Sequence, residues 1–229
     1  LLLPAETSAN TKLVIYDYTS TISLSQKNIV RLKKGDNLDY KHPKYDDSSW
    51  IITSFPSNWN TIFPHWKGIC WYRIHITFPK HKPVHSLGIR LGVIKDVDEV
   101  YFNGNLIGRS GKFPPNKESA YDKKRIYELP SSLIKPGKGN VLAIRIAGMF
   151  PDVNGPYKGT FEIGAFYALQ KKMLSREFID VFFVIIYLVS SFVFALFYFL
   201  RSIQKEYIFF SLFLFSMSIY FFFRTQVKY

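Results

Sequence analysis

One stretch of twelve residues, 57–68, gathers most of the side chains that could recognise a small polar ligand. It reads SNWNTIFPHWKG and includes Asn58, Trp59, His65, Trp66 and Lys67. Indole rings offer a flat apolar surface, while amide, imidazole and ammonium groups can form hydrogen bonds with hydroxyls. That combination suits the face and the hydroxyl edge of a sugar ring. The alternative is structural: Trp59 and Trp66 would then close one end of a β-sandwich.

Two arginines outside this stretch could each donate paired hydrogen bonds to a carboxylate or a diol. Arg73 lies in an apolar run, and Arg109 follows an Asn-Gly turn. For Arg73 the alternative is a salt bridge to a neighbouring strand. Asp96 and Asp98 could help to bind Ca²⁺, but calcium takes about six to eight oxygen ligands. With two carboxylates in view, a solvated turn is favoured there.

Motifs for catalysis, metal binding and nucleic-acid binding are missing from the sequence. The five histidines have no zinc spacing, and neither a phosphate-binding glycine loop nor a nucleophile motif is present. The net charge of +13 is spread along the chain as single lysines, which indicates a solvated surface or a face against anionic lipid. The single cysteine, Cys70, is expected to be a buried structural thiol. We therefore expect no cofactor, no nucleic-acid partner and no enzyme activity within this chain.

Short segments with strand character recur between residues 24 and 169, separated by glycine and proline turns. The expected strands are 50–55, 70–78, 86–91, 99–102, 105–108, 124–129, 140–147 and 160–169. In the run at 70–78, one face would hold Cys70, Tyr72, Ile74 and Ile76, and the other a semi-polar set. Asn103 and Gly104 supply the positive φ angles of a type I′ hairpin turn. Many short strands without crossover helices predict an all-β jelly-roll sandwich.

Two apolar segments near the end of the chain predict a transmembrane α-helical hairpin. Residues 181–200 are uncharged, and 20 residues of helix span about 30 Å. A second run at 207–223 follows a short polar segment, RSIQKE. The expected organisation is an N-terminal segment at 1–23, a sandwich at 24–170, a linker at 171–177, helices at 178–200 and 207–225, and a loop at 201–206.

The side of the membrane is not decided by the charges next to the two spans. The opening LLLPAETSAN resembles the end of a signal peptide with a small-residue cleavage region. This favours a bacterial inner-membrane protein with the β-domain outside, in the periplasm, and the loop 201–206 inside. The expected partners are the lipid bilayer and a carbohydrate or small polar ligand, with a homodimer as an open alternative.

Four ordered segments carry a resemblance to a known family. They are DDSSWIITSFPSNW, GICWYRIHITFP, LGIRLGVIKDVDEVYFNGNLIGRSG and YELPSSLIKPGKGNVLAIRI. Over about 120 residues their order and spacing resemble the sugar-binding domain of glycoside hydrolase family 2 enzymes. The resemblance implies a galactose-binding-like jelly roll. Those enzymes continue into a catalytic barrel with two carboxylates, whereas this chain continues into apolar helices.

The order of domains resembles instead that of bacterial seven-transmembrane receptors with diverse intracellular signalling modules. That resemblance implies a sensor fragment whose extracytoplasmic domain binds a ligand and acts on the membrane helices. The alternative is a membrane-anchored carbohydrate-active enzyme or lectin with a non-catalytic sugar-binding module. Fold alone does not decide between them.

Overall fold

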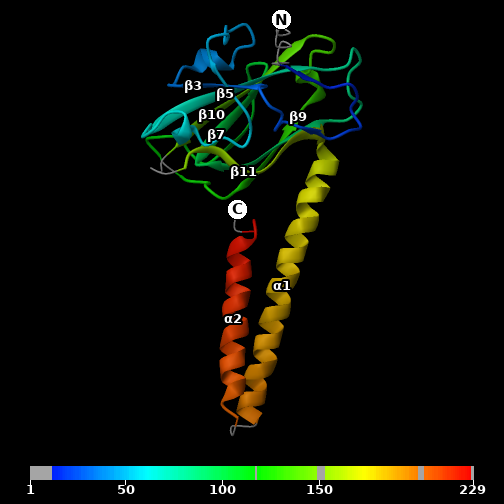
Figure 1. Ribbon diagram of the computed structural model, residues 1–229. Coiled ribbons are helices and arrows are strands. Elements are labelled where there is room, and N and C mark those ends of the chain that lie inside the picture. The colour runs from blue at the N-terminus through cyan, green and yellow to red at the C-terminus, as the bar shows by residue number, and fades with distance from the viewer. Residues whose placement is uncertain (1–11, 117, 149–152, 201–203, 228–229) are drawn as a thin grey trace, which may run out of the picture. The chain divides into compact units, whose positions relative to one another are not determined.

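The computed structural model describes residues 12–116, 118–148, 153–200 and 204–227. The chain divides into two compact units. We call Leu1–Leu169 the sandwich unit and Gln170–Tyr229 the helix unit. The sandwich unit is built of two mainly antiparallel sheets, and two long apolar helices follow the last strand (Figure 1). The predicted fold class, a β-sandwich followed by two apolar helices, is confirmed.

All eight expected strands are present, although the last, expected at 160–169, ends at Ala165 and gives way to a helix. Three short strands precede them. The strands are β1 Leu13–Val14, β2 Ile22–Ser23, β3 Val30–Lys34, β4 Ile51–Thr53, β5 Gly68–Thr77, β6 Leu87–Lys95, β7 Val97–Phe102, β8 Asn105–Ser110, β9 Lys124–Leu129, β10 Gly139–Gly148 and β11 Gly155–Ala165. Three 3₁₀ turns lie between them, η1 Leu38–Lys41, η2 Trp59–Thr61 and η3 Ser131–Leu133. In the predicted hairpin between β7 and β8, Asn103 and Gly104 have φ of 50° and 89°, as the turn requires.

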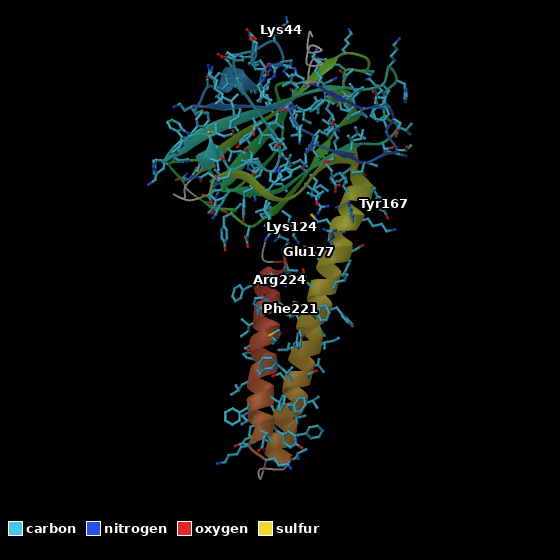
Figure 2. The ribbon with its side chains drawn as sticks, in the orientation of Figure 1. Lys44, Lys124, Tyr167, Glu177, Phe221 and Arg224 are labelled. Carbon is cyan, nitrogen blue, oxygen red and sulfur yellow. The ribbon has the colours of Figure 1, made fainter. Side chains whose placement is uncertain are left out.

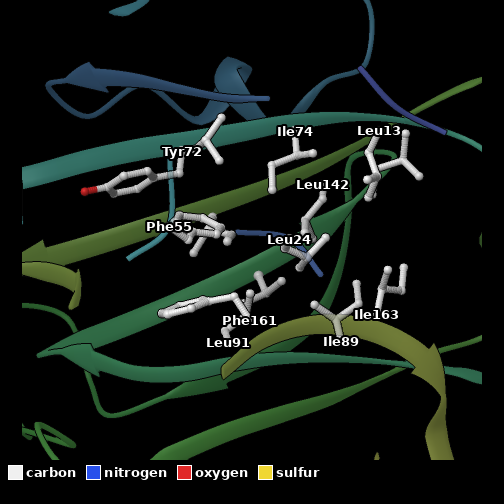
Figure 3. Packing of buried hydrophobic residues seen from close by; sticks show 14 of the residues in the cluster. Leu13, Leu24, Phe55, Tyr72, Ile74, Ile89, Leu91, Leu142, Phe161 and Ile163 are labelled. Atoms are coloured by element: carbon white, nitrogen blue, oxygen red, sulfur yellow. The ribbon is translucent and has the colours of Figure 1, made fainter. Parts of the chain in front are cut away.

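The larger sheet has the order β4-β3-β5-β10-β7-β8, with β1 parallel to β5 at its side. The smaller sheet has the order β2-β11-β6-β9. Large apolar side chains from both sheets meet between the two layers, among them Tyr72 and Ile74 of β5 and Ile89 and Leu91 of β6 (Figure 3). This core holds the sandwich together, because burying each such side chain contributes about 1.5 to 3 kcal/mol.

The two faces of β5 follow the predicted alternation, with one difference. Cys70, Tyr72, Ile74 and Ile76 are fully buried between the sheets. The opposite face, expected to be semi-polar, is also largely buried, since residues 36–50 fold over it. Trp50 and Tyr40 from this covering segment pack on Trp71 and form a second small core.

The sandwich begins earlier than the predicted boundary at residue 24. Leu13 and Ile15 are buried in the main core, and β1 pairs with the end of β5. Part of the predicted N-terminal segment therefore belongs to the sandwich, because its apolar side chains complete the core. Residues 1–11, where the signal-peptide remnant was predicted, lie outside the described part of the chain.

The first helix is longer than the sequence indicates. Helix α1 is Phe166–Leu200, so the predicted linker 171–177 is helical, and α2 is Glu206–Arg224. Both helices are long and apolar enough to span a membrane, and only 6% and 11% of the residues in their most apolar windows are buried. Of the predicted loop 201–206, residues 201–203 lie outside the described ranges.

Polar contacts join α1 and α2 within the helix unit. The Ser191 hydroxyl donates to the Ser211 carbonyl at 2.8 Å, and the Ser211 hydroxyl donates to the Ser191 carbonyl at 2.9 Å. Glu177 accepts a hydrogen bond from the Gln226 amide at 2.9 Å, and Phe221 stacks on α1 further along (Figure 2). The two helices are therefore antiparallel neighbours, as the short connection predicts.

Candidate functional site

The predicted ligand loop, residues 57–68, lies at the end of the sandwich where β11 begins. The Ser57 amide donates to the Pro156 carbonyl at 2.7 Å, and the Trp59 amide donates to the Asn154 carbonyl at 3.2 Å. Pro156 is the second residue of β11. The loop is thus fastened to the beginning of that strand.

Two of the predicted ligand residues build this loop. The Asn58 side-chain oxygen caps η2 by accepting from the Asn60 amide at 3.1 Å, and it also accepts from the Asn154 amide at 3.2 Å. Trp59 has no exposed surface and belongs to the main core. Trp59 therefore fits the structural alternative, in which it closes one end of the sandwich, because no face of its ring is open to a ligand.

The other three residues of the loop form its accessible part. His65 and Lys67 are exposed, and Trp66 is half-buried against the core. The Lys34 ammonium lies 5.4 Å from the centre of the Trp66 ring, a distance typical of a cation–π contact. His65, Trp66 and Lys67 remain candidates for contact with a ligand at this end of the sandwich.

Arg73 is turned away from solvent and is held inside the domain. Its Nε donates to Asp47 at 2.6 Å, and its two Nη groups donate to the carbonyls of Tyr40, His42 and Tyr45. The alternative considered for Arg73, a salt bridge, is present, but its partner Asp47 is in the covering segment and not on a neighbouring strand. With no exposed surface, Arg73 fastens this segment to β5.

Asp47 is the centre of a charged network that the ligand-site prediction missed. Its carboxylate accepts from Arg31 Nη1 at 2.6 Å, from Arg73 Nε at 2.6 Å and from His75 Nε2 at 2.8 Å. Burial alone would raise the pKa of Asp47, but the hydrogen bonds and charges of His75 and Arg73 outweigh it and lower the pKa to about 2. Asp47 belongs to the run DDSSW that opens the first family-like segment, and this run is the sequence signal for the network.

Arg109 lies apart from the other candidates. It is exposed on β8 opposite Glu99 of β7, three strand positions away from β5. At about 4.8 Å per strand this is about 14 Å from the Trp71 position on β5. Of the seven predicted residues, His65, Trp66 and Lys67 are accessible neighbours in one loop, and Arg109 is exposed on another strand.

The two aspartates weighed as calcium ligands are engaged in internal contacts. Asp98 is fully buried and accepts from Arg125 Nε at 2.8 Å and from the Tyr127 hydroxyl at 2.5 Å. Burial raises the pKa of Asp98, against the opposing charge of Arg125. Asp96 accepts from the Ser119 hydroxyl at 2.9 Å. Among the described residues, no group of three or more His, Cys, Asp or Glu side chains is placed to hold a metal ion.

A cavity of about 400 Å³ lies at the other end of β11, where sequence reasoning placed no site. Its wall combines the turn around Tyr18 with the loop before β6, residues 81–86, and it includes Ala165, the last residue of β11. Two segments far apart in the sequence form it, so no local motif could have indicated it.

Cys70 lies in the core, where burial raises the pKa of its thiol to about 12.

Comparison with known proteins identifies the fold alone. No family model matches the chain, and no curated protein matches it. Among solved structures, a β-glucuronidase of Bacteroides uniformis is 18% identical with a TM-score of 0.51, and the match covers 63% of this chain and 18% of that one.

Two further solved structures give the same result. A β-glucuronidase from glycoside hydrolase family 2 is 17% identical, with a TM-score of 0.54 and coverage of 66% and 18%. A family 2 glycosyl hydrolase of Bacteroides cellulosilyticus is 14% identical, with a TM-score of 0.53 and coverage of 63% and 20%. This chain thus spans about a fifth of the length of the glycosidases that it matches. Its β-domain has a fold found in glycoside hydrolase family 2 enzymes, as the ordered segments indicate.

Proposed function

We propose that the chain is the sensory part of a bacterial membrane receptor. In this proposal the sandwich lies outside the inner membrane and binds a small polar ligand, with carbohydrate as the first class to test. The helices α1 and α2 span the membrane and respond to the structural change that ligand binding causes in the sandwich. The described residues bind and do not catalyse.

The observation that carries this proposal is the junction between β11 and α1. Strand β11 ends at Ala165, and the helix begins at the next residue. The Phe166 amide donates to the Ser86 carbonyl at 3.1 Å, and Leu169 is 1% exposed. The first turn of α1 is therefore packed into the sandwich unit, and a change in β6 or β11 at this end would act on the helix directly.

The character of the helices supports a membrane location. Their surfaces are rich in exposed phenylalanine and leucine. Such surfaces favour aggregation in water but are compatible with the hydrocarbon core of a bilayer. The polar groups of Ser191 and Ser211 are turned toward each other, as expected where lipid offers no hydrogen-bond partner.

Labelling of single cysteines in intact cells tests the membrane topology. Lys44 is exposed on the sandwich (Figure 2) and Lys205 is exposed before α2, so Lys44→Cys and Lys205→Cys form a matched pair. We expect a membrane-impermeant maleimide to label the first in intact cells and the second only after permeabilisation. Cys70 is buried, which keeps the background low. The reverse pattern would place the sandwich in the cytoplasm and end the receptor proposal.

Hydrogen exchange tests the coupling between ligand and helix. The full chain in lipid nanodiscs is exposed to galactose, glucose and cellobiose, with binding followed by saturation-transfer NMR. A bound saccharide should change the exchange of the amides in residues 166–176. Binding without any such change would show that the sandwich and α1 act independently.

A second candidate is a membrane-anchored module of a carbohydrate-active enzyme or lectin. It is favoured by the solved structures of similar fold, which are β-glycosidases. In that case a saccharide binds and the helices serve as an anchor alone, so the exchange experiment distinguishes the two candidates.

A further inference from the structure

The cavity lies beside the β11–α1 junction, where a bound molecule would contact Ala165, the residue that precedes the helix. Ala165 forms part of its wall and is paired with Leu87, which also lines it. Ser86, a further wall residue, provides the carbonyl that accepts from the Phe166 amide. The junction and the cavity therefore share residues, all within the sandwich unit.

The walls of this cavity are largely apolar. Tyr18 packs edge-on against His81, with ring centres 5.2 Å apart, and its hydroxyl donates to the His81 carbonyl at 2.7 Å. Pro83, Val84 and Leu87 add aliphatic surface. A volume of about 400 Å³ is within the usual range for small-molecule sites, about 300 to 1,000 Å³.

The polar groups of the wall favour a negatively charged ligand group. Lys82, His81 and His85 all line the cavity, and no acidic residue occurs in the sequence between Asp47 and Asp96. Asp17 is the acidic residue in the wall. Lys82 is exposed and therefore accessible to a ligand.

The carboxylate of Asp17 is already engaged by its own turn. It accepts from the amides of Thr19 and Ser20 at 2.8 Å each, and from both of their hydroxyls. The hydrogen bonds from Thr19 and Ser20 lower the pKa of Asp17 to about 2. Asp17 is therefore ionised at neutral pH and adds one negative charge to the wall, but its oxygens are occupied by donors of its own turn. The exposed groups left to donate to a ligand are those of Lys82, His81 and His85.

We propose that this cavity binds a small organic acid, with its apolar body against Tyr18, Leu87 and Ala165 and its carboxylate at Lys82. The inference deepens the sensor function proposed above, on which it rests, by naming a ligand class and a site next to the helix. An ammonium–carboxylate hydrogen bond fixes the orientation of the acid. His81 and His85 provide further donors at the same rim.

The test uses the full chain in nanodiscs of uncharged lipid at neutral pH. Benzoate, phenylacetate and hexanoate are titrated to about 10 mM and followed by saturation-transfer NMR and calorimetry. Benzyl alcohol is the neutral counterpart, glucuronate carries the same charge on a hydroxylated ring, and lactose is a neutral sugar. We expect at least one of the three acids to bind, and more tightly than the alcohol, glucuronate or lactose.

Charge reversal at two positions of one loop identifies the site. Lys82→Glu should weaken binding of the acid by about tenfold or more, because it replaces a charge-assisted hydrogen bond with repulsion. Lys80→Glu is the control, since Lys80 is exposed in the same connection between β5 and β6, just before residues 81–86, and does not line the cavity. Tryptophan fluorescence checks the fold, because all four tryptophans lie between residues 50 and 71.

Four results would overturn the proposal: no binding of any of the three acids, equal binding of benzyl alcohol, preference for glucuronate or lactose, or equal loss in both variants. The proposed sensor function fails separately. If the acids do not bind but a saccharide changes the exchange of residues 166–176, the sensor stands and this site falls. If an acid binds through Lys82 and neither the acid nor a saccharide changes that exchange, the site stands and the sensor falls.

Discussion

Replacing Asp47 by asparagine should destabilise the sandwich strongly at neutral pH. The carboxylate joins Arg31, Arg73 and His75, and its pKa in the folded state is lowered from 3.8 to about 2. A tenfold change in an acid constant corresponds to about 1.4 kcal/mol, so the ionised form contributes about 2 kcal/mol at pH 7. Asparagine also leaves the Arg73 charge buried without its counter-ion, which raises the expected loss to about 3 kcal/mol.

Urea unfolding of the full chain in micelles, followed by tryptophan fluorescence, measures this loss. With a slope of about 2 kcal/mol per molar urea, the midpoint of Asp47→Asn should fall by about 1.5 M. Asp46→Asn is the control: Asp46 is exposed and accepts from the Ser48 amide at 3.0 Å, which the asparagine oxygen can also do. Its effect should stay within about 0.5 kcal/mol.

The pH dependence provides the sharper test. Because the folded pKa of Asp47 lies below its unfolded value, the stabilisation is present above about pH 4 and is lost as the pH falls toward 2. The difference between the wild-type protein and Asp47→Asn should therefore shrink over this window, since a protonated aspartate resembles asparagine. A difference that stays constant between pH 5 and about pH 2, or a variant as stable as Asp46→Asn, would refute the argument.

Three further predictions concern the junction, the hairpin and the helix pair. Gly88→Ala places a methyl group 3.0 Å from the first residue of α1. We expect the free energy of unfolding to fall by about 1 to 3 kcal/mol and hydrogen exchange at residues 166–169 to become faster. Gly139→Ala is the control and should change little, because nothing lies within 4 Å of its added methyl group. Asn103→Ala should cost about 1 kcal/mol more than Asn103→Gly in urea unfolding, because both lose the side-chain hydrogen bonds but only alanine is strained at a φ of 50°. Combining Ser191→Ala with Ser211→Ala should weaken the helix pair by about 1 kcal/mol, read by energy transfer between dyes on α1 and α2. The loss should be less than the sum of the single changes, because either change alone already removes the contact between the two hydroxyls at 3.2 Å.

The parts of the fold that the sequence predicts are those set by local chemistry. Alternation in β5 depends on the two-residue period of a strand, and the β7–β8 turn depends on the positive φ of Asn103 and Gly104. Both are visible in a few neighbouring residues. The eight predicted strands, β4 to β11, were found for the same reason.

The features that the sequence leaves hidden depend on distant contacts. Trp59 resembles a ligand-stacking residue until Asn154, 95 positions later, fixes its loop and buries its ring. Arg73 resembles a ligand donor until the covering segment brings Asp47 to it. Strands β1 and β2 have two residues each, too few for any periodicity.

The start of α1 shows how a distant contact decides between strand and helix. Residues 160–169 are apolar enough for either, and the sequence favours a strand throughout. Pairing with β6 ends where Leu87 meets Ala165, because the chain before Leu87 turns away into the loop at 81–86. Beyond this point a strand would leave its amides unpaired, so the chain continues as a helix, whose hydrogen bonds are internal. The loop before β6 therefore fixes the residue at which α1 begins, and since this loop also forms the cavity wall, a ligand there would act on the element that sets the helix in place.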